Sequence, residues 1–283
     1  MRFGFFGINL GVCAEPEAAV RVARALEAAG FDSVWTGEHV VLPDPQAPPS
    51  PSPPRAAFLD PAVSLSFIAA HTREVLLATG IIILPQRNPL VLAKEIASLD
   101  VLSKGRAVLG IGAGYLHQEF RALGISFERR GERSDEYLDA IRALWTLEQP
   151  HFAGEFVSFA GIDAHPRPVQ KPGPPIVVGG TSPGALRRAV SRGNGWYGFA
   201  LDPAGTERCL QGLEKARSEV QRPAELGRLE ISVTPPPGLD AEGVRRYAAL
   251  GVDRLVLLGM HPDEGRLLRF VEESAAKLFP AAR

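Results

Sequence analysis

The sequence predicts a single (β/α)8 barrel, and three observations support this fold class. Residues 75–115 contain two apolar runs without alternation, joined by a helix-period segment, as in parallel strands buried on both faces and connected by a crossover helix. Eight strand-like runs alternate with helical segments along the chain. The 283 residues contain no low-complexity linker, and barrels of about 250 residues commonly form one domain, so we predict one domain over residues 1–283. A doubly wound open sheet is disfavoured because about six strands suffice for it.

The first half of the chain supplies four of the predicted strands. A helical pattern follows the first apolar run and stops at Gly30. Asp60 and Pro61 are typical of an N-cap and a first-turn proline. The predicted strands are residues 3–8, 32–40, 75–85 and 106–112, and the predicted helices are 15–29, 62–71 and 89–105.

The second half repeats the alternation after one interruption. Residues 151–170 alternate and turn on Gly154 and Gly161, which predicts a β-hairpin insertion near residues 151–165. The remaining predicted strands are 174–180, 193–199, 229–235 and 253–259, and the predicted helices are 117–123, 133–147, 183–192, 203–220, 241–250 and 262–278.

A proline-rich loop follows the second predicted strand. Residues 42–54 contain seven prolines, which are incompatible with a helix interior or a central strand. Because the loop leaves the C-terminal end of a strand, we interpret it as a semi-rigid lid.

Composition excludes several classes of partner. A net charge of -1 provides no electrostatic footprint for nucleic acid or anionic membranes, and no apolar run approaches the roughly 18 residues of a membrane span. Cys13 and Cys209 fit neither a disulfide framework nor a zinc spacing, which suits a reducing cytoplasm. Gly7, Asn9 and Gly11 interrupt the N-terminal apolar run, so we interpret it as a first strand and not as a signal peptide.

Candidate functional residues follow the predicted strands, because barrel active sites lie at the C-terminal strand ends. His39 directly ends the second strand, where its imidazole can exchange a proton near neutral pH or simply cap a loop. Glu38 either orients His39 or points outward, since adjacent residues on a strand face opposite sides. The other strand-end candidates are Asn9, Gln86, Arg87, the segment 112–115 and the segment 179–182.

Two glycine-rich segments have alternative interpretations. Residues 179–182 precede a predicted helix, where backbone N–H groups bind phosphate, but Thr181 or Ser182 can equally be an ordinary N-cap. Residues 110–115 do not complete the GxGxxG pattern, and we interpret their glycines as allowing close approach of a flat ligand. The six histidines show no metal-binding spacing. Glu119 is interpreted as part of a solvated first helical turn, and Arg187 and Arg188 as an exposed helix face.

Five long stretches of the chain closely resemble the luciferase-like monooxygenase superfamily, in particular its oxidoreductases that depend on the deazaflavin coenzyme F420. The order and spacing of the stretches make the match specific, although each motif alone is weak. The stretches are residues 30–43, 59–72, 76–115, 127–145 and 165–196.

The resemblance implies a bacterial luciferase-like (β/α)8 barrel, usually homodimeric, with a flavin or deazaflavin ring at the C-terminal mouth. His39 matches the family histidine that contacts the ring or the substrate. Gly80 and Ile81 match a pair that forms a non-proline cis peptide in many members. The matched cofactor-binding positions also include Gly112, Ala113, Gly114 and Gln118 beside the cofactor, and Gly179, Gly180, Thr181 and Ser182 near the ring edge and phosphate.

Two departures from the family refine the expected function. Ala113 stands where FMN-using members carry an arginine for the phosphate, which favours F420 over FMN. Tyr115 stands where sugar-phosphate dehydrogenases carry a glutamate, which argues against glucose-6-phosphate oxidation. Tyr115 would instead line the substrate pocket or donate a proton. The resemblance thus implies an F420-dependent oxidoreductase acting on a small organic substrate. An FMN-dependent monooxygenase and a non-catalytic flavin- or F420-binding protein are the alternatives.

Overall fold

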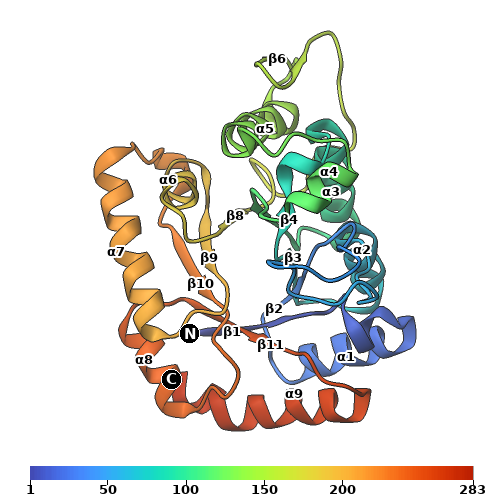
Figure 1. Cartoon of the computed structure of the whole chain (residues 1–283), viewed down its shortest axis with the longest axis vertical. Helices are drawn as coiled ribbons and strands as arrows, with labels where there is room; N and C mark the ends of the chain where they lie inside the picture. Colours follow the sequence, from blue (N-terminus) through green and yellow to red (C-terminus); the bar gives the residue numbers. More distant parts are fainter. Residues whose placement is uncertain (283) are drawn as a thin grey trace.

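Eight parallel strands close into a barrel in the computed structural model, which describes residues 1–282 (Figure 1). The strands follow one another around the barrel in the order β3-β2-β1-β11-β10-β9-β8-β5, and a parallel pairing of β3 with β5 closes the ring. This closure confirms the predicted (β/α)8 barrel and excludes the open sheet. The barrel strands are β1 (Arg2–Phe6), β2 (Ser33–Thr36), β3 (Leu76–Thr79), β5 (Ala107–Gly112), β8 (Ile176–Gly179), β9 (Gly195–Gly198), β10 (Glu230–Val233) and β11 (Arg254–Leu258).

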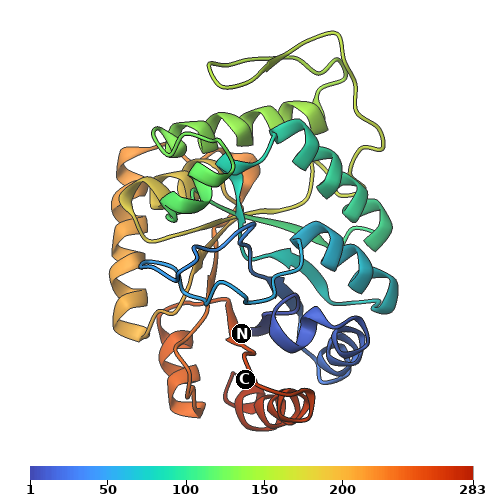
Figure 2. The same ribbon diagram turned by 45° about the vertical axis from the view of Figure 1, so that its right-hand side comes forward.

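Helices surround the barrel (Figure 2), and one of them begins at Asp60, a polar N-cap that the sequence indicated. The Asp60 carboxylate accepts a hydrogen bond from the Val63 N–H, and Pro61 opens the helix, as predicted. In the described part of the chain, no helix is long and apolar enough to cross a membrane. The α-helices are α1 (Pro16–Ala28), α2 (Pro61–His71), α3 (Pro89–Ser103), α4 (His117–Ala122), α5 (Arg130–Thr146), α6 (Pro183–Arg192), α7 (Pro203–Glu219), α8 (Ala241–Ala249) and α9 (Glu264–Leu278). The 3-10 helices are η1 (Gly11–Ala14), η2 (Leu84–Gln86), η3 (Ala224–Leu226) and η4 (Phe279–Ala282).

The second and third predicted strands end well before their apolar runs do. The second strand ends at Thr36, so Glu38 and His39 lie on the loop that follows it. The predicted strand 75–85 is divided into β3 and a short β4 (Ile82–Ile83), and the peptide bond between Gly80 and Ile81 in the interruption is cis. Apolar runs report burial, whereas hydrogen-bond pairing decides where a strand ends, so the two differ at strand ends.

The predicted hairpin is present as the antiparallel pair β6 (Phe152–Ala153) and β7 (Ser158–Phe159), which projects from the barrel beyond α5 (Figures 1 and 2). Glu136 on α5 anchors its turn by accepting hydrogen bonds from the backbone N–H groups of residues 155–157. The proline-rich segment 42–54 contains neither helix nor strand. Its role as a lid stays a prediction.

The apolar core has two parts. A large cluster fills the space between strands and helices, and a second cluster fills the barrel interior. At the N-terminal end of the barrel, the buried Arg254 forms ion pairs with Asp32 and Glu230. The interior cluster comprises Phe6, Leu10, Trp35, Ala78, Val108, Val177, Tyr197 and Val256.

The interpretation of Arg188 as an exposed residue is wrong. Its side chain is 5% exposed, and its guanidinium donates to the Asp135 carboxylate at 2.6 Å and to the Gly131 carbonyl at 2.7 Å. Arg188 therefore joins α6 to α5, whereas its neighbour Arg187 is exposed as predicted.

Candidate active site

His39 lies at the C-terminal mouth of the barrel with both ring nitrogens engaged. Its Nδ1 is 3.3 Å from a carboxylate oxygen of Glu119, and its Nε2 is 3.3 Å from the hydroxyl of Tyr115. The His39 side chain is 7% exposed. Three residues from the loop after β2, the loop after β5 and helix α4 thus form one hydrogen-bonded chain.

Glu119 is the buried end of this chain, so its interpretation as a solvated residue is wrong. Its side chain has no exposed surface, and its second oxygen accepts hydrogen bonds from the N–H groups of Val40, at 2.6 Å, and Val41, at 3.4 Å. These bonds compensate for burial of the carboxylate. Glu119, and not the neighbouring Glu38, therefore orients His39. Its position in the first turn of a short helix contained no local signal of this role.

Glu38 points away from His39 and forms a separate ion pair. Its carboxylate accepts from the Arg87 guanidinium and from the Ile83 N–H, and its side chain is buried. Burial raises the pKa of Glu38, while the charge of Arg87 lowers it. Of the two alternatives for Glu38, the one in which it orients His39 is wrong, because the Arg87 guanidinium and the Ile83 N–H bind its carboxylate. We assign Glu38 to fastening the loop after β2 onto η2.

Tyr115 is the solvent-facing end of the chain. The residue is 46% exposed, and partial burial together with the nearby Glu119 charge raises the pKa of its hydroxyl. Because an ionised carboxylate only accepts hydrogen bonds, Glu119 favours the His39 tautomer that carries its proton on Nδ1. The unprotonated Nε2 then accepts a hydrogen bond from the Tyr115 O–H. Such a chain can move a proton between the mouth and the buried carboxylate.

The cis peptide between Gly80 and Ile81 lies in the interruption between β3 and β4, next to the end of β2. The Gly80 N–H donates to the carbonyl of Thr36, the last residue of β2. The Ile81 side chain packs across two predicted cofactor glycines: a Cβ at Gly112 would lie 2.6 Å from Ile81 Cδ1, and one at Gly179 would lie 2.9 Å from Ile81 Cγ2. We therefore correct the interpretation of the Gly112 region, because glycine there makes room for Ile81 and not directly for a ligand.

The other predicted cofactor residues gather at the ends of β5 and β8. Ser182 is the N-cap of α6, accepting from the Ala185 N–H at 3.3 Å, and Pro183 follows in the first turn. Gly180 and Thr181 are exposed beside it. The structure thus confirms the N-cap interpretation at Ser182. Phosphate binding by this segment stays a prediction, which is compatible with the cap because an N-cap leaves further backbone N–H groups of the first turn without intrahelical partners. Ala113, Gly114 and Gln118 are partly buried in the loop after β5 and the first turn of α4.

Asn9, another strand-end candidate, has a structural role. Its side-chain amide donates to the carbonyls of Gly37 and Leu59 and accepts from the Gly37 N–H. All of these bonds join loops at the mouth, so Asn9 has little hydrogen-bonding capacity left for a ligand.

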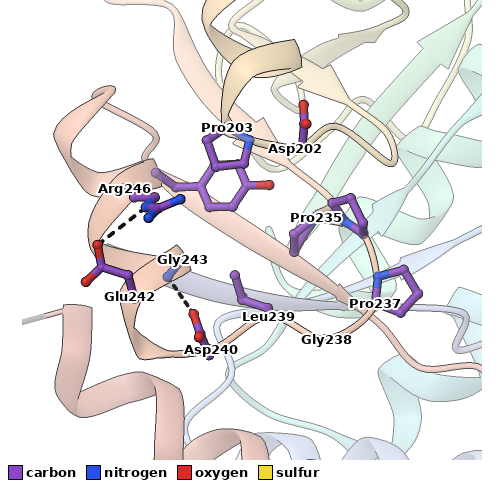
Figure 3. A pocket seen from close by; sticks show the side chains of 12 residues that line it. Asp202, Pro203, Pro235, Pro237, Gly238, Leu239, Asp240, Glu242, Gly243 and Arg246 are labelled. Carbon is purple, nitrogen blue, oxygen red and sulfur yellow. Dashed lines mark hydrogen bonds and ion pairs between the residues drawn. The ribbon is translucent and has the colours of Figure 1, made fainter.

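Two cavities near the rim of the barrel are not lined by His39. One cavity of about 290 Å³ lies between the start of α7 and the loop of residues 235–240 that precedes α8 (Figure 3). Its polar groups are already engaged, since Asp202 and Asp240 cap the two helices and Arg246 points toward Glu242. The second, of about 240 Å³, is lined by residues after β1 and β11, including His261. Neither cavity is lined by the hydrogen-bonded residues Tyr115, His39 and Glu119. We therefore place the candidate site by the positions of the C-terminal strand ends.

A (β/α)8 barrel with a hydrogen-bonded histidine at its C-terminal mouth is typical of a barrel enzyme, and sequence comparison assigns the family. The luciferase-like monooxygenase family model matches residues 2–276, and the chain belongs to this family. This membership supports an oxidoreductase activity. It also confirms the family resemblance stated from the motifs.

Individual relatives differ in cofactor. An uncharacterised protein of Mycobacterium tuberculosis is 35% identical over 276 residues, covering 93% of each chain. The oxygenase component of a flavin-dependent trigonelline monooxygenase from Acinetobacter baylyi is 31% identical over 176 residues, which cover 62% of this chain and 46% of that protein. The structure of an F420-dependent secondary alcohol dehydrogenase with an F420–acetone adduct has a TM-score of 0.80 at 18% identity, covering 100% of this chain and 99% of that chain. The structural match shows the shared fold.

Proposed function

We propose that this protein is an F420-dependent oxidoreductase that passes hydride between the deazaflavin coenzyme and a small organic substrate. The observation that carries the proposal is the hydrogen-bonded chain of Tyr115, His39 and Glu119 at the barrel mouth. Hydride transfer to or from a carbon that bears oxygen also requires a proton to move at that oxygen, and this chain is built to move one.

The residues at the mouth fit a deazaflavin coenzyme with a phosphate group. Exposed Thr181 and Ser182 hydroxyls, together with the N-terminus of α6, form a donor set suited to an anion. Ala113 leaves the neighbouring loop without the arginine of FMN-using members, which supports F420. When bound, the coenzyme would supply or accept the hydride. Ile81, held against Gly112, is the apolar surface we propose for contact with its ring.

The protein's own residues would manage the proton. The substrate proton reaches the exposed Tyr115 hydroxyl while the proton of that hydroxyl passes to His39 Nε2. The imidazolium formed in this way is stabilised by the Glu119 carboxylate, whose position is held by two backbone N–H groups. In the opposite direction the same groups return the proton.

We further propose a homodimer formed through α2 and α3. These neighbouring helices expose apolar side chains, among them Val63 at 70% and Val91 at 55%. Exposed apolar patches on packed helices commonly mark a protein–protein interface.

Titration of the apoprotein with F420 and, separately, with FMN tests the cofactor assignment. We expect micromolar or tighter F420 binding by coenzyme fluorescence and much weaker FMN binding. The reverse preference would instead favour an FMN-dependent monooxygenase. Binding of neither would remove the proposed function, and tight F420 binding without oxidation of any donor would favour a non-catalytic binding protein.

Two variants test the proton chain. His39→Ala and Tyr115→Phe are expected to lower kcat by roughly 100-fold or more, because each removes a link in the acid–base chain. His151→Ala and Tyr137→Phe are matched controls outside the site and should retain activity. Unchanged turnover and coenzyme affinity in His39→Ala would show that the assigned role is wrong.

A further inference from the structure

One buried side chain joins the two ends of the segment that contains the proline-rich loop. Asn9 has no exposed surface, and its Nδ2 donates to the carbonyl of Gly37 at 2.8 Å and to the carbonyl of Leu59 at 2.6 Å. Its Oδ1 accepts from the Gly37 N–H at 2.9 Å, and its own carbonyl accepts from the Leu59 N–H at 3.1 Å. We call Gly37 and Leu59 the neck of the loop. The hydrogen bonds of Asn9 hold this neck closed.

The closed neck places two aromatic rings beside each other. His39 lies just after one end of the neck, and Phe58 lies directly before the other. The centroids of the His39 and Phe58 rings are 5.5 Å apart, and their planes meet at 85°. Leu10, which follows Asn9, forms an isolated antiparallel bridge with Phe58. One short segment of the chain therefore fixes the backbone on both sides of this contact.

The Phe58 ring is also held by the barrel interior. It packs against the interior apolar cluster and over Gly37, where a Cβ would lie 3.2 Å from the Phe6 ring and 3.6 Å from the Phe58 ring. Glycine at this position lets both rings approach the backbone closely. Because its backbone and its ring are both constrained, Phe58 is placed beside His39 by packing at the neck and not by the prolines of residues 42–54.

Phe58 and Tyr115 together leave little of the imidazole open to water. The Tyr115 ring lies 5.9 Å from the His39 ring between centroids, again at 85°. The His39 side chain is 7% exposed, whereas Tyr115 is 46% exposed, and its hydroxyl lies 3.3 Å from His39 Nε2. The Glu119 carboxylate engages the other ring nitrogen. The Tyr115 hydroxyl is therefore the group that connects the imidazole with the mouth.

We infer that Asn9 and Phe58 are positioning residues of the proton chain. Asn9 holds the neck closed, and Phe58 shields His39 from water, so that His39 exchanges protons with the substrate through the Tyr115 hydroxyl. Water at the imidazole would compete with Tyr115 for Nε2, and it would weaken the attraction between the imidazolium and the Glu119 carboxylate. The shielding follows from the geometry of the chain, whereas its catalytic consequence rests on the proposed function.

Chemical modification of the purified protein measures this shielding without coenzyme or substrate. Diethyl pyrocarbonate acylates unprotonated imidazole nitrogens, and peptide mass spectrometry reports the rate at each histidine. In the wild type we expect His39 to react about tenfold more slowly than the exposed His151. Phe58→Ala should raise the His39 rate about tenfold and leave the His151 rate unchanged. Phe58→Leu keeps much of the apolar volume and should give an intermediate rate.

Two substitutions test the neck. Asn9→Leu keeps a similar volume but removes the side-chain hydrogen bonds, and it should raise the His39 rate as Phe58→Ala does. Asn9→Asp is the milder variant, because it keeps an acceptor for the Gly37 N–H and removes both donors. The half-buried His71 at the end of α2 is the internal reference. Equal increases at His39 and His71 would show a general loosening of the fold and would overturn the positioning role of Asn9.

The shield itself can be refuted directly. Equal rates for His39 and His151 in the wild type would overturn it, and so would an unchanged His39 rate in Phe58→Ala. Phe152→Ala, which truncates a ring on the projecting hairpin, is the matched control and should leave every histidine rate unchanged.

Titration of the same samples with F420 separates the shield from the proposed function. Shielding that depends on Phe58, in a protein that binds no F420, would overturn the proposed function and support the shield. F420 binding in a protein whose His39 reacts as fast as His151 would support the coenzyme assignment and overturn this inference.

Discussion

Replacing Arg87 by methionine should destabilise the protein strongly. The Arg87 guanidinium joins three carboxylates. Its Nε donates to a Glu38 oxygen at 3.0 Å, and a terminal nitrogen donates to an Asp60 oxygen at 2.6 Å. Its other terminal nitrogen lies 3.5 Å from a Glu95 oxygen. Methionine keeps much of the side-chain volume and removes the charge. The Glu38 side chain, 2% exposed, would then keep the Ile83 N–H as its remaining partner.

The expected magnitude follows from the burial of Glu38. Removing one partner of a buried ion pair costs about 3–5 kcal/mol, because the other charge stays buried without compensation. For a domain of this size, that loss corresponds to a decrease of roughly 10 °C in Tm. Thermal and urea unfolding of Arg87→Met and the wild type would measure it.

The loss should depend on pH in a defined direction. Burial already raises the pKa of Glu38, and removing Arg87 removes the charge that lowers it. A carboxyl whose pKa is higher in the folded state than in the unfolded state contributes stability at low pH, and this contribution disappears as pH rises through the folded-state pKa. The deficit of Arg87→Met should therefore be smaller at about pH 5 than at about pH 8.

The double variant Glu38→Gln/Arg87→Met is the control, since it removes both charges and should recover part of the lost stability. A deficit of less than about 1 kcal/mol at neutral pH, typical of a surface pair, would refute the reasoning. An equal deficit at both pH values would show that Glu38 is not the group responsible.

Three further predictions concern the site and the assembly. Glu119→Gln should lower kcat about 10–100-fold with F420 affinity unchanged, because His39 loses the carboxylate that orients it; unchanged steady-state kinetics would contradict this. Gly112→Ala should cost about 1–3 kcal/mol in urea unfolding because its Cβ would lie 2.6 Å from Ile81 Cδ1. Ile81→Val in the same chain removes that atom and should restore part of the loss. Val63→Asp should convert the proposed homodimer into monomers by sedimentation, and a stable dimer would exclude this interface.

Secondary structure was largely predictable because its signals are local. Apolar runs and helical periodicity located the eight barrel strands, and the hairpin was recognisable from alternation and its glycines. Asp60 and Pro61 predicted the start of α2 because a cap depends on residues within one turn. Strand ends were less accurate: the second strand stops at Thr36, and the third is interrupted at a cis peptide that the family resemblance, and not periodicity, had indicated.

The site was predictable only in part. His39 was singled out as a candidate because barrel topology brings every C-terminal strand end to one mouth. Its partner was not, because the sequence suggested the adjacent Glu38, whereas the carboxylate that contacts it belongs to Glu119, 80 positions along the chain. Tyr115 was a candidate, but its bond to His39 depends on how the loop after β5 folds over the loop after β2.

The sequence by itself determined the barrel, the family and the strand-end segments that carry the site. Tertiary structure alone decided the partners: Glu119 for His39, Arg87 for Glu38, and Ile81 for Gly112 and Gly179. The physical reason is the distance along the sequence over which each kind of signal acts. Periodicity and capping are properties of a few consecutive residues, whereas a buried carboxylate or a missing Cβ is explained by an atom that packing brings from another strand or helix.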